Sequence, residues 1–406
     1  MSVQSTDDVA ALTRRLVEVD ATNPSLVAGG AGEREIAVII AEWLAGRGFE
    51  ARLVGADAAR PSVLARRRGT GGGRTLLLAG HLDTVGGTGT GTGTGTGKGN
   101  GTGADGAAHA DPDRIVGRGA YDMAGGLAAA MIAAADAPRD LVGDVVLAFA
   151  ADEEFGSSGM EELLAAIDAD ETHAESADRR PDGAVVLEPT DLEVTLAHRG
   201  FAWYRVEYEG VAAHGSQPEL GVDAIDRALD GLVALRALGA ELDARSRHPL
   251  LGSGSVRVAA VEGGTDAATV ADRCELVVER RTLPGDADPM AELQRVLAAS
   301  RPARVVALVA RPAMEADATS RIARAVLDAV EGVTGATAVR RGDPWWTDAG
   351  LIAAADIPVV LVGPSGGGAH ADEEWVSVAS LETLVAVIGR VIRDFCGEPD
   401  TAASAR

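Results

Sequence analysis

Short apolar runs alternate with helical stretches over the first half of the chain. Apolar runs of strand length occur at residues 49–54, 62–67, 75–80, 144–150 and 183–189. Stretches at residues 33–45, 124–137 and 161–167 read as helices. A first helix is predicted to start near Thr6–Asp7 and to end before Asn23–Pro24. Apolar strands separated by helices indicate an α/β domain built on a buried sheet.

The pattern changes at about residue 199. Strands are predicted at residues 201–210, 253–264, 271–283 and 303–310, and helices at residues 222–238 and 290–299. One sheet with two helices is typical of a small α+β layer. The first style then resumes, with helices at 319–330 and 381–395 and a strand at 358–363. The simplest organisation is one domain, residues 1–198 and 311–406, into which residues 199–310 are inserted.

Composition narrows the possible partners and the compartment. Of the 406 residues, 46% are hydrophobic, which is enough for a substantial core. Acidic residues outnumber basic ones by 61 to 37, and a net charge of −24 argues against nucleic acid or membrane partners. The two cysteines, Cys274 and Cys396, form no disulfide framework or thiolate metal motif. Because the N-terminus has no apolar run of signal-peptide length and no stretch of the sequence nears the length of a membrane span, we expect a soluble cytoplasmic protein.

A Gly-Thr tract at residues 86–106 is the only low-complexity segment of the sequence. Alternating glycine has a high ordering cost and offers no apolar face, so a flexible surface loop is expected. A Walker loop is excluded because Gly99 follows Lys98 where serine or threonine is needed. GTGADG, residues 101–106, matches GxGxxG but follows no strand and opens no helix. The tract therefore gives no support to nucleotide binding.

Polar residues suited to metal binding follow several of the predicted strands. Each has an ordinary explanation alone, such as a helix-capping aspartate or a solvated strand end. Together they supply two imidazoles and several carboxylates without a thiolate, which is the ligand set of catalytic zinc, manganese or cobalt, especially of paired-metal hydrolases. The candidates are His81, Asp83, Asp122, Glu153, Glu154, Glu188 and His370.

Eight motifs carry a resemblance to a known family. They are GHLDTV, GRGAYDMAGG, DEEFGSSG, LEPT, AAHGSQPELGVDAI, RRTLPGD, WWTDAG and GGGAHADEEWV. In this order the chain resembles the acetylornithine deacetylase, succinyl-diaminopimelate desuccinylase and glutamate carboxypeptidase family of co-catalytic zinc metallohydrolases. The resemblance covers nearly the whole chain. It implies a mostly parallel sheet sandwiched by helices, as in zinc exopeptidases, with an inserted α+β dimerisation or lid domain.

The resemblance also implies a ligand set for two divalent ions. His81 and Glu188 would bind one ion, His370 and Glu154 the other, and Asp122 would bridge the two. Zinc is the expected metal, with cobalt or manganese as alternatives. Asp83 lies two residues from His81 along the strand end, so its carboxylate can orient the imidazole.

Three further residues receive roles from the resemblance. Glu153 would be the general base that activates a metal-bridging water and then protonates the leaving amine. His214 would reach across a dimer interface to stabilise the oxyanion. Arg281 would bind the substrate carboxylate, with Arg280 on the opposite face of the strand as the competing choice. The pair Trp345–Trp346 either shapes the substrate pocket or packs in the core.

These features favour metal-dependent deacylation of an N-acyl amino acid by a homodimer. The alternative is a di- or carboxypeptidase of the same family acting on short peptides. A catalytically silent binding protein on this fold predicts a missing ligand or base, and none is missing from the sequence.

Overall fold

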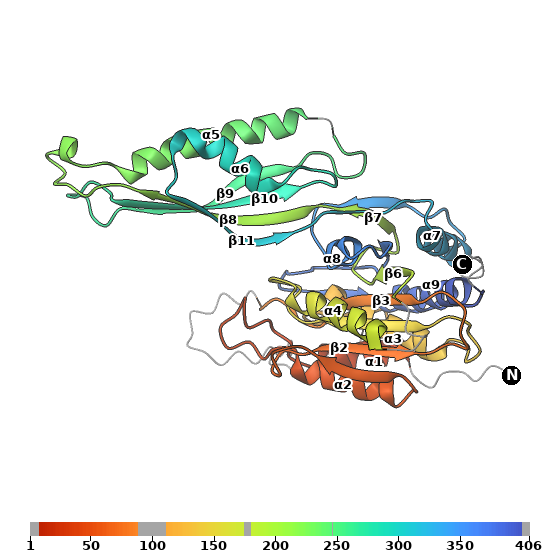
Figure 1. Ribbon diagram of the computed structural model, residues 1–406. Coiled ribbons are helices and arrows are strands. Elements are labelled where there is room, and N and C mark those ends of the chain that lie inside the picture. Colours follow the sequence, from red (N-terminus) through yellow and green to blue (C-terminus); the bar gives the residue numbers. More distant parts are fainter. Residues whose placement is uncertain (1–7, 88–110, 174–179, 246, 400–406) are drawn as a thin grey trace. The chain divides into compact units, whose positions relative to one another are not determined.

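The computed structural model describes residues 8–87, 111–173, 180–245 and 247–399, and it divides the chain into two compact units (Figure 1). Unit 1 comprises Met1–Leu196, Ala316–Arg341 and Thr347–Arg406. Unit 2 comprises Ala197–Glu315 and Gly342–Trp346. Its second segment lies outside the expected insertion. Most of the Gly-Thr tract, residues 88–106, falls outside the described residues.

Unit 1 is built on a sheet that is parallel at its centre. The strand order is β1-β2-β5-β3-β6-β14-β7. The bounds are β1 Glu50–Val54, β2 Ser62–Arg67, β3 Leu76–His81, β5 Val145–Ala150, β6 Gly183–Val186, β7 Val194–His198 and β14 Val359–Leu361. β3 pairs in parallel with β5 and β6, and β14 pairs in parallel with β6. β2, β3, β5 and β6 are buried along their whole length, as their apolar composition predicts.

Helices cover the sheet of unit 1. Their bounds are α1 Val9–Val17, α2 Arg34–Ala45, α3 Gly125–Asp136, α4 Ser158–His173, α7 Arg321–Thr334, α8 Ala349–Ala354 and α9 Val378–Cys396. Alternate residues of β3, Leu76 and Leu78, join the large apolar core formed with α1, α2, α3, α7 and α9. α4 contacts β2 and β5 and packs beside α8. The predicted helix-flanked, mostly parallel α/β sheet is confirmed. No described helix is long and apolar enough to cross a membrane.

A second, three-stranded sheet of unit 1 joins distant parts of the chain. β15 (Gly366–Gly367), β16 (Trp375–Ser377) and β4 (Arg114–Val116) form it in the order β15-β16-β4. Both pairs are antiparallel, with Trp375 opposite Val116 and Gly367 opposite Trp375. The sheet therefore holds the segments that precede Asp122 and flank His370 close together.

Unit 2 is an antiparallel sheet with two helices, in the order β11-β8-β10-β9. The bounds are β8 Gly200–Glu209, β9 Ser255–Gly263, β10 Arg273–Thr282, β11 Arg304–Arg311, α5 Ala224–Ala244 and α6 Pro289–Leu297. Buried residues alternate with half-exposed ones along the second half of β8, so one face packs against the helices. Tyr204, Leu235, Leu276 and Leu293 belong to this core. The remaining short strands are β12 Met314–Glu315 and β13 Arg340–Asp343.

Some element limits differ from the prediction. α1 begins at Val9, with Asp8 as its N-cap, because the Asp8 carboxylate accepts the N–H of Ala10 at 2.9 Å. α5 continues to Ala244, well beyond the expected end at Leu238. α8 was not predicted, since six residues are too few to show a helical period.

Candidate metal centre

The predicted ligands meet at one edge of the unit 1 sheet. His81 is the last residue of β3, which is parallel to β5 and β6. Glu154 follows β5 and Glu188 follows β6, so the carboxyl ends of three neighbouring strands bring these side chains to the same edge. Asp122 lies in the turn Ala120–Ala124 that leads into α3, and His370 follows β15.

Asp122 lies between the two histidines. Its Oδ1 atom is 3.0 Å from His81 Nε2, and its Oδ2 atom is 3.4 Å from His370 Nε2. Glu188 Oε1 is 4.0 Å from His81 Nε2, and Glu154 Oε2 is 3.1 Å from His370 Nε2. Donor atoms of His81, Asp122 and Glu154 all lie within 4.8 Å of one another. One carboxylate that faces two imidazoles, each with its own second carboxylate, fits a pair of divalent ions.

Buried acidic groups crowd the centre. Burial raises the pKa of Glu153 well above its ordinary value, and nearby Glu188, Asp348 and Glu154 raise it further, whereas His81 opposes the rise. Burial likewise raises the pKa of Glu188, against the opposing effect of His81. Carboxylates packed this closely are stabilised by added positive charge. The electrostatics of the site therefore agree with its donor set.

The neighbouring carboxylates raise the pKa values of both histidines. Burial works to lower the pKa of His81, but hydrogen bonding to Asp122 and the charge of Glu188 raise it well above its usual value. Hydrogen bonds with Asp122 and Glu154 raise the pKa of His370 to about 10. Burial works to raise the pKa of Asp122, yet the two histidines hold it well below the ordinary range. The acidic cluster thus favours positive charge at both imidazole positions.

Asp83 organises the centre through both its main chain and its side chain. Its carbonyl oxygen is 2.9 Å from His81 Nδ1, whereas its carboxylate Oδ1 is 3.8 Å away from that nitrogen. The hydrogen bond nearest the ring is therefore to the carbonyl and not to the carboxylate that the sequence suggested. The carboxylate instead accepts the N–H groups of Glu153 at 3.0 Å and Glu154 at 3.2 Å. Asp83 thereby fixes the turn that carries both glutamates.

A hydrogen-bonded network behind this turn was not predicted. Asp152 adopts a left-handed conformation, with φ of 67°, immediately before Glu153. Its Oδ1 atom is 3.0 Å from Arg60 Nη2 and 3.2 Å from Asn23 Nδ2. Arg60 also pairs with the fully buried Glu33 at 2.6 Å. Arg60 therefore supplies positive charge beside the DEE run. No motif in the sequence marks Arg60 or Asn23.

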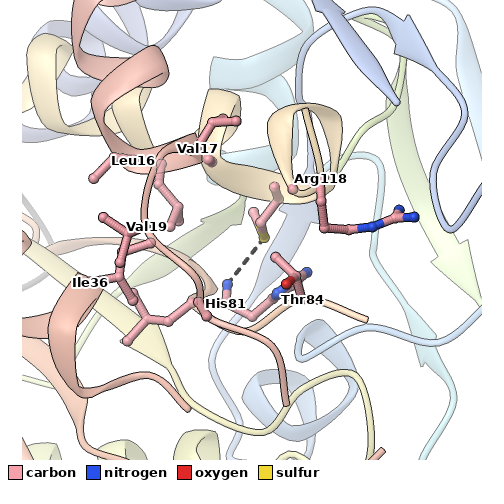
Figure 2. Close-up of a pocket in the computed structure, with 13 residues that line it drawn as sticks. Leu16, Val17, Val19, Ile36, His81, Thr84 and Arg118 are labelled. Atoms are coloured by element: carbon pink, nitrogen blue, oxygen red, sulfur yellow. Dashed lines mark hydrogen bonds between the residues drawn. The ribbon is translucent and has the colours of Figure 1, made fainter. Parts of the chain in front are cut away.

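A small hollow behind His81 shows how β3 is held (Figure 2). Its lining is mostly apolar and includes Leu16 and Ile36. The N–H of His81 donates to the sulfur of Met123 at 3.1 Å. A Cβ atom at Gly80 would lie 2.5 Å from the Met123 methyl carbon, so glycine in GHLDTV permits this close approach. The residues that line this hollow therefore support His81 from behind, and the hollow itself is part of the packing around the metal centre.

The predicted residues of unit 2 are described within that unit. His214 is exposed, and its Nδ1 atom is 2.8 Å from Ser216 Oγ. Arg280 is buried and pairs with Glu292 at 2.9 Å and Asp286 at 3.2 Å. Internal carboxylates therefore neutralise Arg280, the competing choice. The catalytic role of His214 stays a prediction.

Arg281 and the tryptophan pair have different surroundings. Arg281 is partly exposed, pairs with Glu279 and lies 5.3 Å from the centre of the Phe201 ring. Trp346 is buried, donates from Nε1 to the Pro312 carbonyl at 2.9 Å and packs edge-on against Phe201. Trp346 thus packs in the core, which is one of the two expected alternatives. Binding of a substrate carboxylate by Arg281 stays a prediction.

The α/β fold and the cluster of histidines and carboxylates at its strand ends define a metallohydrolase. A model of peptidase family M20/M25/M40 matches residues 77–394, so the chain belongs to this family. The resemblance drawn from the eight motifs is confirmed.

Curated relatives and solved structures agree with this assignment. Acetylornithine deacetylase of Myxococcus xanthus is 29% identical over 83% of this chain and 84% of its own. A probable carboxypeptidase of Aspergillus terreus is 31% identical over 59% of this chain and 52% of its own. An M20 metallo-carboxypeptidase from Sulfolobus solfataricus has the same fold, with a TM-score of 0.73 at 16% identity over 96% of this chain and 99% of its own. A dinuclear metal-binding M20 peptidase of Bacillus subtilis gives a TM-score of 0.67 at 15% identity over 94% and 96%.

Proposed function

We propose that the protein hydrolyses the amide bond of an N-acyl amino acid and releases a carboxylate and a free amine. The observation that supports this proposal most strongly is the position of Asp122 between His81 and His370. Glu153 precedes the proposed ligand Glu154 in the sequence. The relative named acetylornithine deacetylase aligns over most of the chain, which favours deacylation of an acetylornithine-like substrate. A succinyl-diaminopimelate-like substrate rests on the resemblance of the motifs alone.

The proposed ligands divide between two divalent ions. His81 and Glu188 would hold one, His370 and Glu154 the other, and Asp122 both. Zinc suits mixed imidazole and carboxylate donors, as do cobalt and manganese. Bound ions would polarise the substrate carbonyl and make water acidic enough to lose a proton near neutral pH.

Glu153 is the proposed general base. Asp83 holds its N–H and that of Glu154, so the base and a proposed ligand share one fixed turn. Glu153 takes a proton from the attacking water and delivers it to the leaving nitrogen as the C–N bond breaks. The proton is thereby transferred from water to amine, and the carboxylate is regenerated for the next cycle.

Unit 2 is proposed to pair with a second copy. On α5, Ile225, Leu229 and Val233 recur every four residues and are 47%, 53% and 53% exposed. Residues four apart share one helix face, so these side chains form an exposed apolar stripe. β9 lies at an edge of its sheet. We propose that in such a dimer His214 acts as an oxyanion donor in the partner's reaction.

A substrate panel tests the reaction. Protein reconstituted with zinc, cobalt or manganese is assayed against N-acetylornithine, N-succinyl-diaminopimelate, other N-acyl amino acids and short peptides. Turnover of the acyl amino acids, lost in the Glu153→Ala variant, supports the proposal. Hydrolysis of peptides alone would favour the di- or carboxypeptidase alternative, which the carboxypeptidase-like relative keeps open.

Mixing two variants tests the role of His214 across subunits. His214→Ala is expected to lower turnover without changing metal content. Combining it with Glu153→Ala should restore partial activity, because one site of the mixed dimer has an intact base and receives an intact histidine. If mixing restores no activity although mixed dimers form, His214 does not act across the interface.

A further inference from the structure

Glu374 is a buried carboxylate with four hydrogen-bond donors around it. It is 2% exposed and lies four residues after His370. Its Oε1 atom accepts the main-chain N–H groups of Tyr121 at 3.0 Å and Asp122 at 2.9 Å. Its Oε2 atom accepts the N–H of Gly119 at 3.0 Å and a guanidinium N–H of Arg118 at 2.7 Å. The Glu374 side chain therefore organises the backbone that presents Asp122.

Arg118 extends the same contact to the turn that carries His370. Its Nη1 atom binds Glu374, and its Nη2 atom donates to the carbonyl of Ala371 at 2.5 Å. Ala371 follows His370, whose backbone is left-handed with φ of 62°, a conformation that a side chain disfavours. The N–H of Ala371 donates to the carbonyl of Gly368 at 2.9 Å and closes this turn. Arg118 thus holds the strained turn from outside.

The main chain supports this arrangement. β4 leads into the Asp122 turn and pairs with β16, which begins directly after Glu374. The carbonyl of Glu374 also accepts the N–H of Gly117 at 2.9 Å. Two loops that are about 250 residues apart in the sequence are therefore joined at the backbone and again through the Arg118–Glu374 pair.

We propose that Glu374 and Arg118 are positioning residues that fix Asp122 relative to His370 and thereby set the spacing of the two metal positions. This inference rests on the proposed function, because it takes Asp122 and His370 as ligands. Neither Glu374 nor Arg118 touches substrate in this scheme. They act through the two side chains whose backbones they hold.

Glu374→Gln tests the proposal with little change in volume. Each carboxylate oxygen faces two donors, so either orientation of the amide places its NH₂ group against two further donors. At least two hydrogen bonds are lost, and the Asp122 turn gains freedom. Glu373→Gln is the matched control, because it removes the same charge from the exposed neighbouring residue.

The measurement is titration of the metal-free full-length protein with Co²⁺ alone, followed by calorimetry and by visible absorption. Glu374→Gln is expected to weaken binding of at least one Co²⁺ ion by tenfold or more and to change its absorption spectrum, whereas Glu373→Gln matches the wild type. Arg118→Lys keeps the charge but has no fork to bind Glu374 and Ala371 together, so a smaller loss is expected.

Thermal unfolding in chelator separates positioning from simple stability. A merely structural role lowers the melting temperature of Glu374→Gln but leaves Co²⁺ affinity and spectrum unchanged well below that temperature, and this result would overturn the proposal. If Glu374→Gln does not fold, Arg118→Lys tests the proposal in its place. Co²⁺ binding by Arg118→Lys that matches the wild type would then overturn the proposal. If the wild type itself does not bind two ions, the proposed function is wrong, and the inference that rests on it is wrong as well.

Discussion

We predict that His198 makes the free energy of unfolding depend on pH between 6.5 and about 4. It ends β7 and has no exposed surface. Its Nδ1 atom is 3.0 Å from the carbonyl of Arg199, which can only accept, so Nδ1 carries the proton of the neutral ring. Among the described residues, its buried Nε2 atom has no hydrogen-bond partner. Burial lowers the pKa of His198 from 6.5 to about 4, with only the Arg199 carbonyl opposing it.

The sign of the effect follows from proton binding. Between pH 6.5 and 4 the unfolded chain binds a proton at this position that the folded chain excludes. The free energy of unfolding therefore falls as the pH falls through this window, and the loss is complete below the folded pKa. A difference of roughly 2.5 pKa units corresponds to about 3 kcal/mol, of which about 2 kcal/mol is lost between pH ~7 and pH ~4.5.

The assay is urea unfolding at these two pH values in the presence of a chelator, so that metal release does not contribute. His198→Asn keeps a donor near the position of Nδ1 but does not titrate. It removes the edge-on contact with Trp346 and is expected to be less stable at both pH values. It should nevertheless lose about 2 kcal/mol less than the wild type on acidification. Equal losses in the two proteins would refute the reasoning.

Three further predictions address the base, the buried network and the dimer. Glu153→Gln should retain two metals by elemental analysis while kcat falls about 100-fold or more, and wild-type kcat would exclude Glu153 as the base. Arg60→Leu leaves buried Glu33 and Asp152 without their cation, so unfolding in urea should show a loss of about 3 kcal/mol, whereas Arg34→Leu on the surface serves as control. Leu229→Glu introduces a charge into the exposed apolar stripe of α5. It should shift the equilibrium from dimer toward monomer, measured by light scattering, with little change in melting temperature. A dimer that is unaffected by this change would show that the interface lies elsewhere.

The sequence by itself determined the fold class and the order of the site motifs. Fully apolar runs identified the buried strands, because a strand covered by helices on both faces has no polar side. His81 and the acids after β5 and β6 could be placed at strand ends, and parallel strands bring those ends to one edge. Alternation also placed Arg280 and Arg281 on opposite faces, since side chains in a strand point alternately to its two sides.

Only the tertiary structure decided which partners these residues have. Glu292 and Asp286 make Arg280 the buried arginine, and neither could be paired with it from spacing alone. The contacts of Arg60 with Asp152, and of Glu374 with the Asp122 turn, span 92 and about 250 residues. Local patterns record which face of an element is buried. Local patterns do not predict which distant carboxylate accepts hydrogen bonds from the N–H groups of a given turn, because that depends on how the loops fold back across the sheet edge.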